Sequence, residues 1–221
     1  MEIVELKVGA SGIVSCLLQK PPRARACYVF AHGAGAGMTH SFMADVANRL
    51  FERDIATLRY QFPYMEKGSR RPDAPSIAHA TVRAAVAEAA LQCSELPLFA
   101  GGKSFGGRMT SQAQALSPLP GVRGLAFIGF PLHPSGKPSE DRAEHLYEIK
   151  IPMLFLQGTR DKLAELPFVE RLATALGRGA RLRLFDHADH SFHVPAKSGS
   201  NDREVMCEML DVLTEWLEEL A

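Results

Sequence analysis

The segment from Leu98 to Arg108 constrains the fold more than any other part of the chain. It begins with a short apolar run typical of a buried strand, continues as Gly-Lys-Ser-Phe-Gly around Ser104, and leads into a helix-forming stretch from Met109 to Leu116. A strand, a Gly-x-Ser-x-Gly turn and a helix in this order form a nucleophile elbow, in which a strained backbone presents the serine hydroxyl above the sheet. Small residues flank such a serine because neighbouring backbone passes close to the turn. We therefore predict that Ser104 is a nucleophile.

Two glycine-rich segments resemble nucleotide-binding loops, and both interpretations fail. The residues around Lys103 would end a Gly-x-x-x-x-Gly-Lys-Ser phosphate loop, but its first glycine falls at Pro97, which also lacks a backbone N–H. The segment from His32 to Met38 would need glycine at its last position to be a Gly-x-Gly-x-x-Gly dinucleotide motif. The histidines elsewhere show no metal-ligand spacing. We expect neither a cofactor nor a metal ion.

Composition favours a single domain without a charged partner. The 221 residues are 46% hydrophobic, enough for one well-buried core, so we predict one domain over residues 1–221. Basic and acidic residues number 25 each, and this zero net charge disfavours nucleic acid and anionic membranes. The four cysteines lack close pairs, which indicates reduced thiols. With neither a leader-like N-terminus nor a membrane-length apolar run, we expect a cytoplasmic location, and the oligomeric state stays open.

Short apolar runs alternate with helix-forming stretches along most of the chain. We predict strands over residues 3–8, 13–19, 26–31, 56–60, 98–101, 124–130, 153–157 and 181–186. We predict helices over residues 41–52, 76–93, 107–116, 165–176 and 201–220. This alternation predicts an eight-stranded, doubly wound, mostly parallel sheet with helices on both faces. The link between the first two strands is too short for a crossover and predicts an antiparallel hairpin.

Two loops, over residues 62–75 and 131–139, follow the predicted carboxyl ends of strands. In an open α/β sheet this edge binds ligands, so these loops should shape the pocket. Neither insertion is large enough for a lid, and we expect no cap domain. An open site of this kind favours a short or polar substrate over a long lipid chain.

Ser104 needs a base and an acid, because a serine hydroxyl is a poor nucleophile until a base takes its proton, and the base needs an acceptor that fixes its tautomer. Asp161 follows the predicted strand over 153–157, and His190 follows the one over 181–186. The order serine, aspartate, histidine is that of α/β-hydrolases. His190 competes with His187 and His193 on the same loop, and His187 is the second choice. Asp186 and Asp189 of that loop compete with Asp161 and are better explained as capping or solvated residues.

These segments resemble the α/β-hydrolase superfamily, and within it the small lidless branch similar to dienelactone hydrolases. The resemblance covers the chain from Ala26 to Leu220 and rests on His-Gly with small residues, the Gly-x-Ser-x-Gly turn, Gly-Thr-Arg-Asp at 158–161 and Ala-Asp-His-Ser-Phe at 188–192. Segments 32–38, 59–64 and 129–134 further resemble small bacterial hydrolases related to testis-expressed proteins and NSL chromatin-complex subunits.

The resemblance implies a serine hydrolase that cleaves a small ester, thioester or lactone through an acyl-enzyme on Ser104. It implies that His190 is the general base and then the acid, and that Asp161 holds the imidazole. Backbone N–H groups of Phe105 and Ala34 would form the oxyanion hole, and nearby glycines would let these donors approach without an intervening side chain. Because some eukaryotic relatives are interaction subunits, the alternative is a non-catalytic interaction or scaffold module that retains the fold.

Three further residues are candidates for contact with a small acyl substrate. Lys103 is either a specificity contact or a side chain held by a neighbouring acid. Arg59, at a strand end, either binds a substrate carboxylate or forms an ion pair that supports a loop. Gly35 belongs to the glycine-rich loop itself, and we expect His32 to brace that loop through a hydrogen bond.

Overall fold

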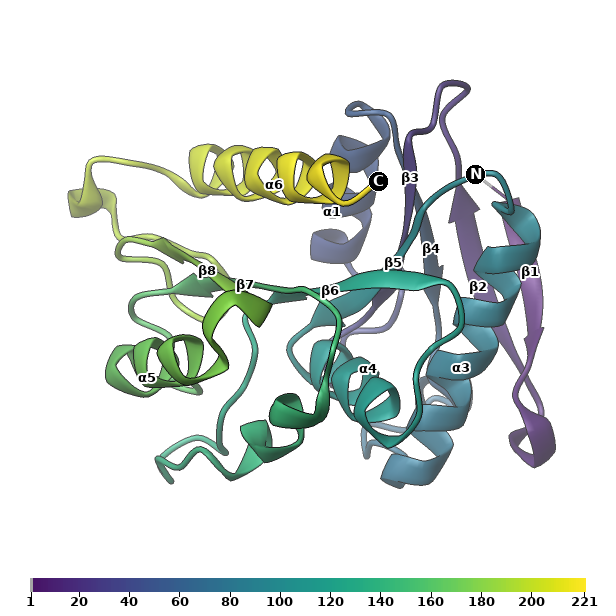
Figure 1. The fold of residues 1–221 in the computed structure, drawn as a ribbon, viewed down its shortest axis with the longest axis horizontal. Helices are drawn as coiled ribbons and strands as arrows, with labels where there is room; N and C mark the ends of the chain where they lie inside the picture. The colour runs from purple at the N-terminus through teal and green to yellow at the C-terminus, as the bar shows by residue number, and fades with distance from the viewer. Residues whose placement is uncertain (1) are drawn as a thin grey trace.

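The computed structural model describes residues 2–221 and contains an eight-stranded sheet with the order β1-β2-β4-β3-β5-β6-β7-β8 (Figure 1). The strands are β1 (Glu2–Lys7), β2 (Ile13–Gln19), β3 (Ala26–Ala31), β4 (Ile55–Tyr60), β5 (Leu98–Lys103), β6 (Val122–Ile128), β7 (Met153–Gly158) and β8 (Ala180–Phe185). Strand β2 pairs antiparallel with β1 and with β4, and the remaining neighbours pair parallel. The predicted hairpin and the mostly parallel sheet are both confirmed.

Helices cover both faces of this sheet. They are α1 (Ser41–Phe51), α2 (Pro63–Glu66), α3 (Pro75–Gln92), α4 (Phe105–Leu116), α5 (Leu166–Leu176) and α6 (Asp202–Glu219), with short 3-10 turns η1 (Gly9–Ser11), η2 (Asp141–Glu148), η3 (Gly177–Gly179) and η4 (Ala196–Ser198). Figure 1 shows α1 and α6 on one face and α3, α4 and α5 on the other. The result is the doubly wound, three-layer α/β fold that the alternation of elements predicts.

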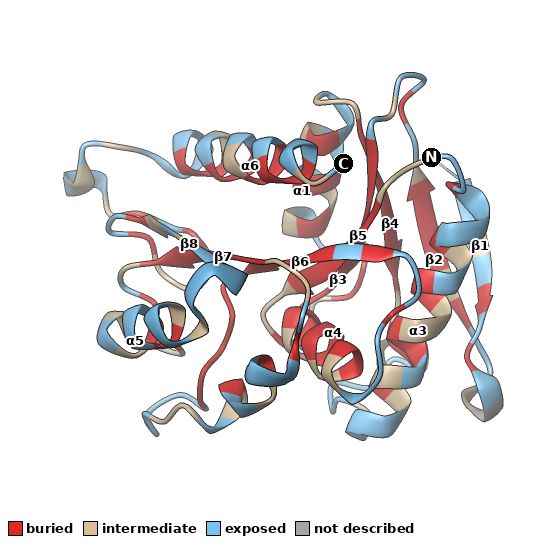
Figure 2. Ribbon diagram, viewed as in Figure 1, coloured by how far each residue is buried: buried red, intermediate tan, exposed pale blue. Residues whose placement is uncertain are grey.

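The core lies in two apolar layers, one on each face of the sheet. Every residue of β3, β4 and β7 is buried, as expected of central strands that helices cover on both sides (Figure 2). On one face, Met209, Leu213 and Trp216 of α6 pack into the same cluster as Val46 of α1. On the other face, α3, α4 and α5 contribute the apolar side of each helix to the second cluster. Burial of both faces fixes the register of the central strands.

The parallel strands all end at one edge of the sheet, and the predicted site residues follow those ends. Strand β3 leads into the glycine-rich loop, β5 into Ser104, β7 into the loop of Asp161, and β8 into the loop of His190. The neighbours of β3 are β4 on one side and β5 on the other, so the strand order reverses between β3 and β5. A ligand crevice forms at such a switch point.

Several predicted bounds differ from the structure by one or two residues, and three of the differences have a local physical cause. Strand β6 ends at Ile128 instead of residue 130, because Gly129 adopts φ 66° and the next N–H, of Phe130, donates to the Gln157 side chain (2.9 Å). Helix α4 begins two residues earlier than predicted, because the carbonyl of Ser104 already accepts a helical hydrogen bond. The predicted loop over 62–75 contains the helical turn α2, which a proline at its first position favours.

Candidate active site

Ser104 lies in a sharp turn between the end of β5 and the start of α4. Its backbone has φ 50° and ψ −115°, a conformation that non-glycine residues rarely adopt. The Ser104 N–H donates to the carbonyl oxygen of Ile128 (3.1 Å), and the Ser104 carbonyl accepts the N–H of Arg108 (3.1 Å). Hydrogen bonds on both sides thus hold the strained residue in place. This is the geometry of a nucleophile elbow.

The glycines beside Ser104 allow a close backbone approach. A Cβ atom at Gly102 would lie 2.5 Å from the carbonyl oxygen of Ala31, and one at Gly106 would lie 2.6 Å from the carbonyl oxygens of Ala31 and His32. These distances are well inside van der Waals contact, so any larger residue would push β3 away from the turn. Glycine at both positions lets the start of α4 dock against the end of β3.

The loop after β8 brings His190 between Ser104 and Asp161. His190 Nε2 lies 2.8 Å from Ser104 Oγ, and His190 Nδ1 lies 2.7 Å from Asp161 Oδ2. Because an ionised carboxylate only accepts hydrogen bonds, Nδ1 carries the proton that it donates to Asp161. Nε2 of the neutral ring then faces the serine hydroxyl as an acceptor. The three side chains form one hydrogen-bonded chain at the carboxyl edge of the sheet.

The other candidates on the histidine loop have different partners. His187 is exposed, and its backbone N–H donates to Thr159 Oγ1 (2.9 Å). His193 Nδ1 pairs at the surface with the carboxylate of Asp202 (2.9 Å). Asp189 Oδ1 accepts two backbone N–H groups of its own loop, at 2.7 and 3.0 Å. Of the three histidines on this loop, His190 is therefore the one in contact with Ser104.

Asp161 is held rigidly, and a residue that the sequence did not single out contributes to this. Its side chain is fully buried, whereas a quarter of the His190 side chain is exposed. Asp161 Oδ1 accepts the Leu163 N–H (2.8 Å), and Oδ2 accepts the Gln157 side-chain amide besides His190. Gln157 in turn accepts the Phe130 N–H (2.9 Å), so it links the ends of β6 and β7. A polar residue near the end of an otherwise apolar strand is the sequence signal that could have revealed the role of Gln157.

The glycine-rich loop after β3 is braced as predicted by His32. The buried imidazole donates from Nδ1 to the Gly33 carbonyl (2.8 Å) and accepts the Phe62 N–H at Nε2 (3.1 Å). Burial lowers the pKa of His32 to about 4, so the ring is neutral at physiological pH. The Gly35 N–H donates to the Tyr64 hydroxyl (3.1 Å), which gives Gly35 an internal partner.

Arg59 supports the same loop from below. Its side chain is 2% exposed, and its guanidinium donates to the carbonyl oxygen of Met38 (3.1 Å) and to Gln19. Arg59 is absent from the lining of both cavities that open at Ser104. The structure therefore places it behind the glycine-rich loop, where it holds the loop's far end.

Ala34 and Phe105 line a cavity beside Ser104, and their backbone N–H groups lack a protein acceptor within residues 2–221. Ala34 is exposed in the glycine-rich loop, and Phe105 is the first residue of α4, where no preceding helical turn exists to accept its N–H. Neither N–H donates a hydrogen bond to any acceptor within residues 2–221. The Phe105 N–H also lies at the positive end of the α4 dipole, which favours negative charge there. An oxyanion hole formed by these two donors stays a prediction.

Ser104 lines two cavities of about 440 Å³ each. Both are also lined by Ala34 and Leu163. The first, which we call the histidine-side cavity, includes His190 and the apolar side chains of Phe42 and Met43. The second, which we call the arginine-side cavity, extends along α4 to Arg108 and Arg142. A group bound to Ser104 therefore has two directions in which its parts can extend.

Lys103 lines the histidine-side cavity and contacts the histidine loop. Its ammonium donates to the backbone carbonyl oxygen of His190 and lies 5.6 and 5.8 Å from the ring centres of Phe192 and Phe42. Burial lowers the pKa of the Lys103 ammonium to about 8, against the opposing effect of the Asp161 and Asp189 carboxylates. Of the two roles considered for Lys103, the one in which a neighbouring acid holds the side chain has this form: the hydrogen-bond acceptor is a backbone carbonyl, and the Asp161 and Asp189 carboxylates act through their charge.

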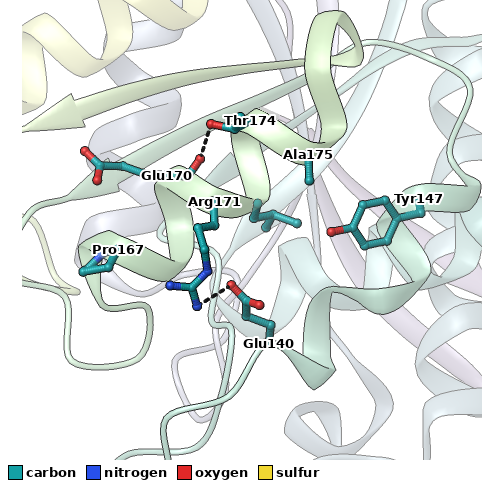
Figure 3. A pocket seen from close by; sticks show the side chains of 8 residues that line it. Glu140, Tyr147, Pro167, Glu170, Arg171, Thr174 and Ala175 are labelled. Carbon is teal, nitrogen blue, oxygen red and sulfur yellow. Dashed lines mark hydrogen bonds and ion pairs between the residues drawn. The ribbon is translucent and has the colours of Figure 1, made fainter.

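A larger hollow, of about 620 Å³, lies between η2 and α5 and is separate from Ser104 (Figure 3). Three charged residues line it, and two of them, Arg171 and Glu140, form an ion pair (3.2 Å). Its lining holds no serine, cysteine or histidine. The cavities at Ser104, although smaller, are the ones that carry reactive side chains.

Within residues 2–221, no group of three or more histidine, cysteine, aspartate or glutamate side chains is arranged to hold a metal ion. None of the helices in the same residues combines the length and the apolar character that a membrane crossing requires.

Comparisons with known proteins support this architecture. The family model of the alpha/beta hydrolase domain matches residues 24–218. A solved structure of dienelactone hydrolase from Anabaena variabilis has a TM-score of 0.77 at 20% identity, covering 99% of this chain and 97% of that one. A serine hydrolase without a lid from Xanthomonas campestris has a TM-score of 0.74 at 17% identity, with 97% and 94% covered. The esterase domain of a Rhodothermus marinus protein has a TM-score of 0.72 at 17% identity, with 99% of both chains covered.

Proposed function

The chain belongs to the alpha/beta hydrolase family, and from that premise we propose that it is a serine hydrolase of carboxylesterase or thioesterase type. It cleaves a small ester, thioester or lactone through an acyl-enzyme on Ser104. One observation carries this proposal above the others. It is the hydrogen-bonded chain from Ser104 through His190 to Asp161, built on a strained elbow that opens into two cavities.

In the proposed first half-reaction, Ser104 Oγ attacks the substrate's carbonyl carbon. As the new C–O bond forms, the hydroxyl proton passes to His190 Nε2, and the carbonyl π electrons move to the oxygen. Asp161 accepts the hydrogen bond from His190 Nδ1–H throughout and stabilises the imidazolium that results. When the tetrahedral intermediate collapses, the bond to the leaving group breaks, and His190 returns its proton to the departing oxygen or sulfur.

The negative oxygen of that intermediate is proposed to bind the N–H groups of Phe105 and Ala34. Donors already in position need no reorganisation during the reaction, and one such donor is worth about 3 kcal/mol of activation free energy. In the second half-reaction, water takes the place of the alcohol or thiol. His190 removes its proton as it attacks the acyl carbon, and Ser104 leaves with the proton that His190 then returns.

The alternative of a scaffold module has less physical support. Backbone strain of the kind at Ser104 costs on the order of 1–3 kcal/mol and persists where function requires it. A protein that served only as a binding surface would gain nothing from that strain. The solved structures with this fold include a dienelactone hydrolase and an esterase domain, whose names agree with cleavage of an ester or lactone.

Short substrates fit the site best. Within residues 2–221 the chain inserts no separate domain above Ser104, and each cavity there measures about 440 Å³. Burial of each further methylene of the acyl chain contributes about 0.8 kcal/mol of binding free energy, and only where the cavity offers an apolar wall to cover it. We therefore place acetyl and butyryl esters above dodecanoyl esters in kcat/KM. The loops over 62–75 and 131–139 contribute Pro72, Asp73 and Pro131 to the arginine-side cavity and so limit its length.

The proposed enzyme acts in the cytoplasm. All four cysteines are free thiols, and Cys16, Cys27 and Cys93 are buried in the core. Free thiols buried in this way suit a reducing compartment.

A panel of p-nitrophenyl esters and matching thioesters, with acyl chains of two to twelve carbons, tests the proposal. Ser104→Ala should lower kcat/KM at least about 1000-fold on the best substrate, because no other group forms the acyl-enzyme. Ser117→Ala, at an exposed serine after α4, is the matched control and should keep full activity. Ser104→Ala with wild-type turnover would refute the role of Ser104, and a preference for the longest chains would refute the size limit.

A further inference from the structure

The arginine-side cavity holds two positive groups that the proposed reaction does not use. Arg108 lies on α4 one helical turn after Ser104, and Arg142 lies on η2. Within residues 2–221, neither guanidinium forms an ion pair or a hydrogen bond, and the Nε atom of Arg108 is buried without a partner. The Arg108 guanidinium lies 6.0 Å from the ring centre of Phe105, a contact that leaves its N–H groups unused. Half-burial of two cations without hydrogen-bond acceptors costs free energy, unless a ligand supplies the acceptors.

The two arginines oppose each other electrostatically. Burial lowers the pKa of the Arg108 guanidinium, and the charge of Arg142 lowers it further. Burial alone lowers the pKa of Arg142. A pair of like charges beside one cavity destabilises the fold, and an anion between them would remove that repulsion. The arrangement is therefore suited to binding a negative group.

The other titratable groups around this cavity do not neutralise the arginines. Asp73 also lines it, but Asp73 Oδ2 already accepts the Tyr64 N–H (2.9 Å). His145 lies near Arg108 and shares a hydrogen bond with Ser111 (2.7 Å). Burial and the charge of Arg108 lower the pKa of His145 to about 4, so it stays neutral. One carboxylate that already accepts a hydrogen bond thus faces two cations that have no hydrogen-bond acceptor.

We propose that Arg108 and Arg142 bind a carboxylate carried by the acyl group of the substrate, which rests on the proposed function of Ser104. A guanidinium presents a planar fork of N–H donors that matches the two oxygens of a carboxylate. The substrates are then monoesters or monothioesters of short dicarboxylic acids. The carboxylate-binding role considered for Arg59 and Lys103 passes to these two residues, which lie at the cavity wall.

The position of His190 decides which part of the substrate carries the charge. The leaving group has to reach His190 Nε2 to be protonated, so it occupies the histidine-side cavity. The acyl chain then extends the other way, into the arginine-side cavity, whose lining excludes His190. Arg108 is four residues after Ser104 on one helix face, about 6 Å further along the axis. That spacing suits an acyl group of glutaryl length.

Two ethyl esters of equal chain length test this inference. Monoethyl glutarate carries the carboxylate, ethyl pentanoate lacks it, and ethanol release measures kcat/KM for both. The ratio of the anionic to the neutral ester should exceed ten in the wild type and fall at least tenfold in Arg108→Gln and in Arg142→Gln. Arg178→Gln removes an exposed charge on η3 and should leave the ratio unchanged. If the neutral ester is hydrolysed and neither variant changes the ratio, the inference is wrong while the serine hydrolase proposal stands.

A binding measurement tests the site independently of turnover. Calorimetric titration of the wild type with glutarate, with neutral glutaramide and with inorganic phosphate should show that glutarate binds and glutaramide does not. Arg142→Gln, on the short η2 turn, should weaken glutarate binding at least tenfold, and thermal unfolding checks that the variant is folded. Equal glutarate affinity in wild type and variant would overturn the inference. Phosphate binding without glutarate binding would also overturn it, since the ligand would then not be a carboxylate.

Discussion

The ammonium of Lys103 donates a hydrogen bond to the backbone carbonyl oxygen of His190. Lys103 is the last residue of β5 and directly precedes Ser104, so this contact ties the nucleophile's strand to the loop that carries the histidine. The Nε2 to Oγ distance of 2.8 Å depends on the relative position of these two segments. We infer that Lys103 is a positioning residue, which acts through the backbone of His190.

Lys103→Met keeps the length and the apolar stem of the side chain but removes the donor. We expect kcat on a short ester to fall about tenfold, because a 1 Å misplacement of a catalytic group can cost up to about a hundredfold. KM should change less than kcat. Lys103→Arg, which retains a donor, should recover part of the loss. Steady-state kinetics of the three proteins provide the measurement, and an unchanged kcat in Lys103→Met would contradict the inferred role.

The stability of the protein should depend on pH through the same side chain. Burial lowers the pKa of Lys103 to about 8 from its usual 10.5, so between these values the folded protein binds fewer protons than the unfolded chain. Stability therefore rises with pH over this range. Between pH 7.5 and 9.5, the free energy of unfolding of the wild type should rise by about 1–2 kcal/mol relative to Lys103→Met. Urea unfolding at both pH values measures this, and a parallel change in both proteins would contradict it.

Replacement of single histidines should separate His190 from its neighbours. His190→Ala should lower kcat on a short ester by a factor similar to that of Ser104→Ala, because its imidazole lies between Ser104 and Asp161. His187→Ala and His193→Ala should lower kcat far less, since neither ring contacts the serine. Initial rates for the three variants decide the matter. A larger loss in His187→Ala would show that the base is misassigned.

The close approach of β3 to the elbow makes Gly106 sensitive to substitution. An added Cβ atom would lie 2.6 Å from the carbonyl oxygens of Ala31 and His32. Gly106→Ala should lower the free energy of unfolding by roughly 3 kcal/mol. Gly179→Ala is the matched control, because a Cβ atom there meets nothing within 4 Å. Denaturant unfolding of both variants should show the loss in the first alone, and equal stabilities would mean that the approach is looser than described.

Much of this fold could be predicted because its signals are local. The apolar runs of β2 and β3 have no competing pattern, and their predicted bounds agree with the structure. The signal of the elbow is likewise local, because the strand, Ser104 and the helix follow one another in the sequence. The carboxyl edge of a parallel sheet then brings Asp161 and His190 together once their strands are assigned. These predictions required the order of elements and the chemistry of three residue types, and the choice of His190 over its neighbours also required the family resemblance of residues 188–192.

The remaining features depend on contacts between distant segments. Gln157 supports Asp161 from within an apolar strand, and its role is visible only when the end of β6 lies beside it. Arg108 and Arg142 are 34 positions apart and meet at one cavity because η2 folds back over α4. For Arg59 the sequence was misleading, because an arginine at a strand end is expected to be exposed. In the structure its side chain is buried behind the glycine-rich loop.

Labelling with a fluorophosphonate followed by peptide mapping tests the central claim most directly. The probe phosphonylates a serine only where a base and an oxyanion site activate it. We expect one adduct, on Ser104, in the wild type and in the control Ser117→Ala, with no adduct in Ser104→Ala. Labelling of His190→Ala should be much slower. An adduct on another serine, or labelling that survives in Ser104→Ala, would contradict the assignment of Ser104 as the nucleophile.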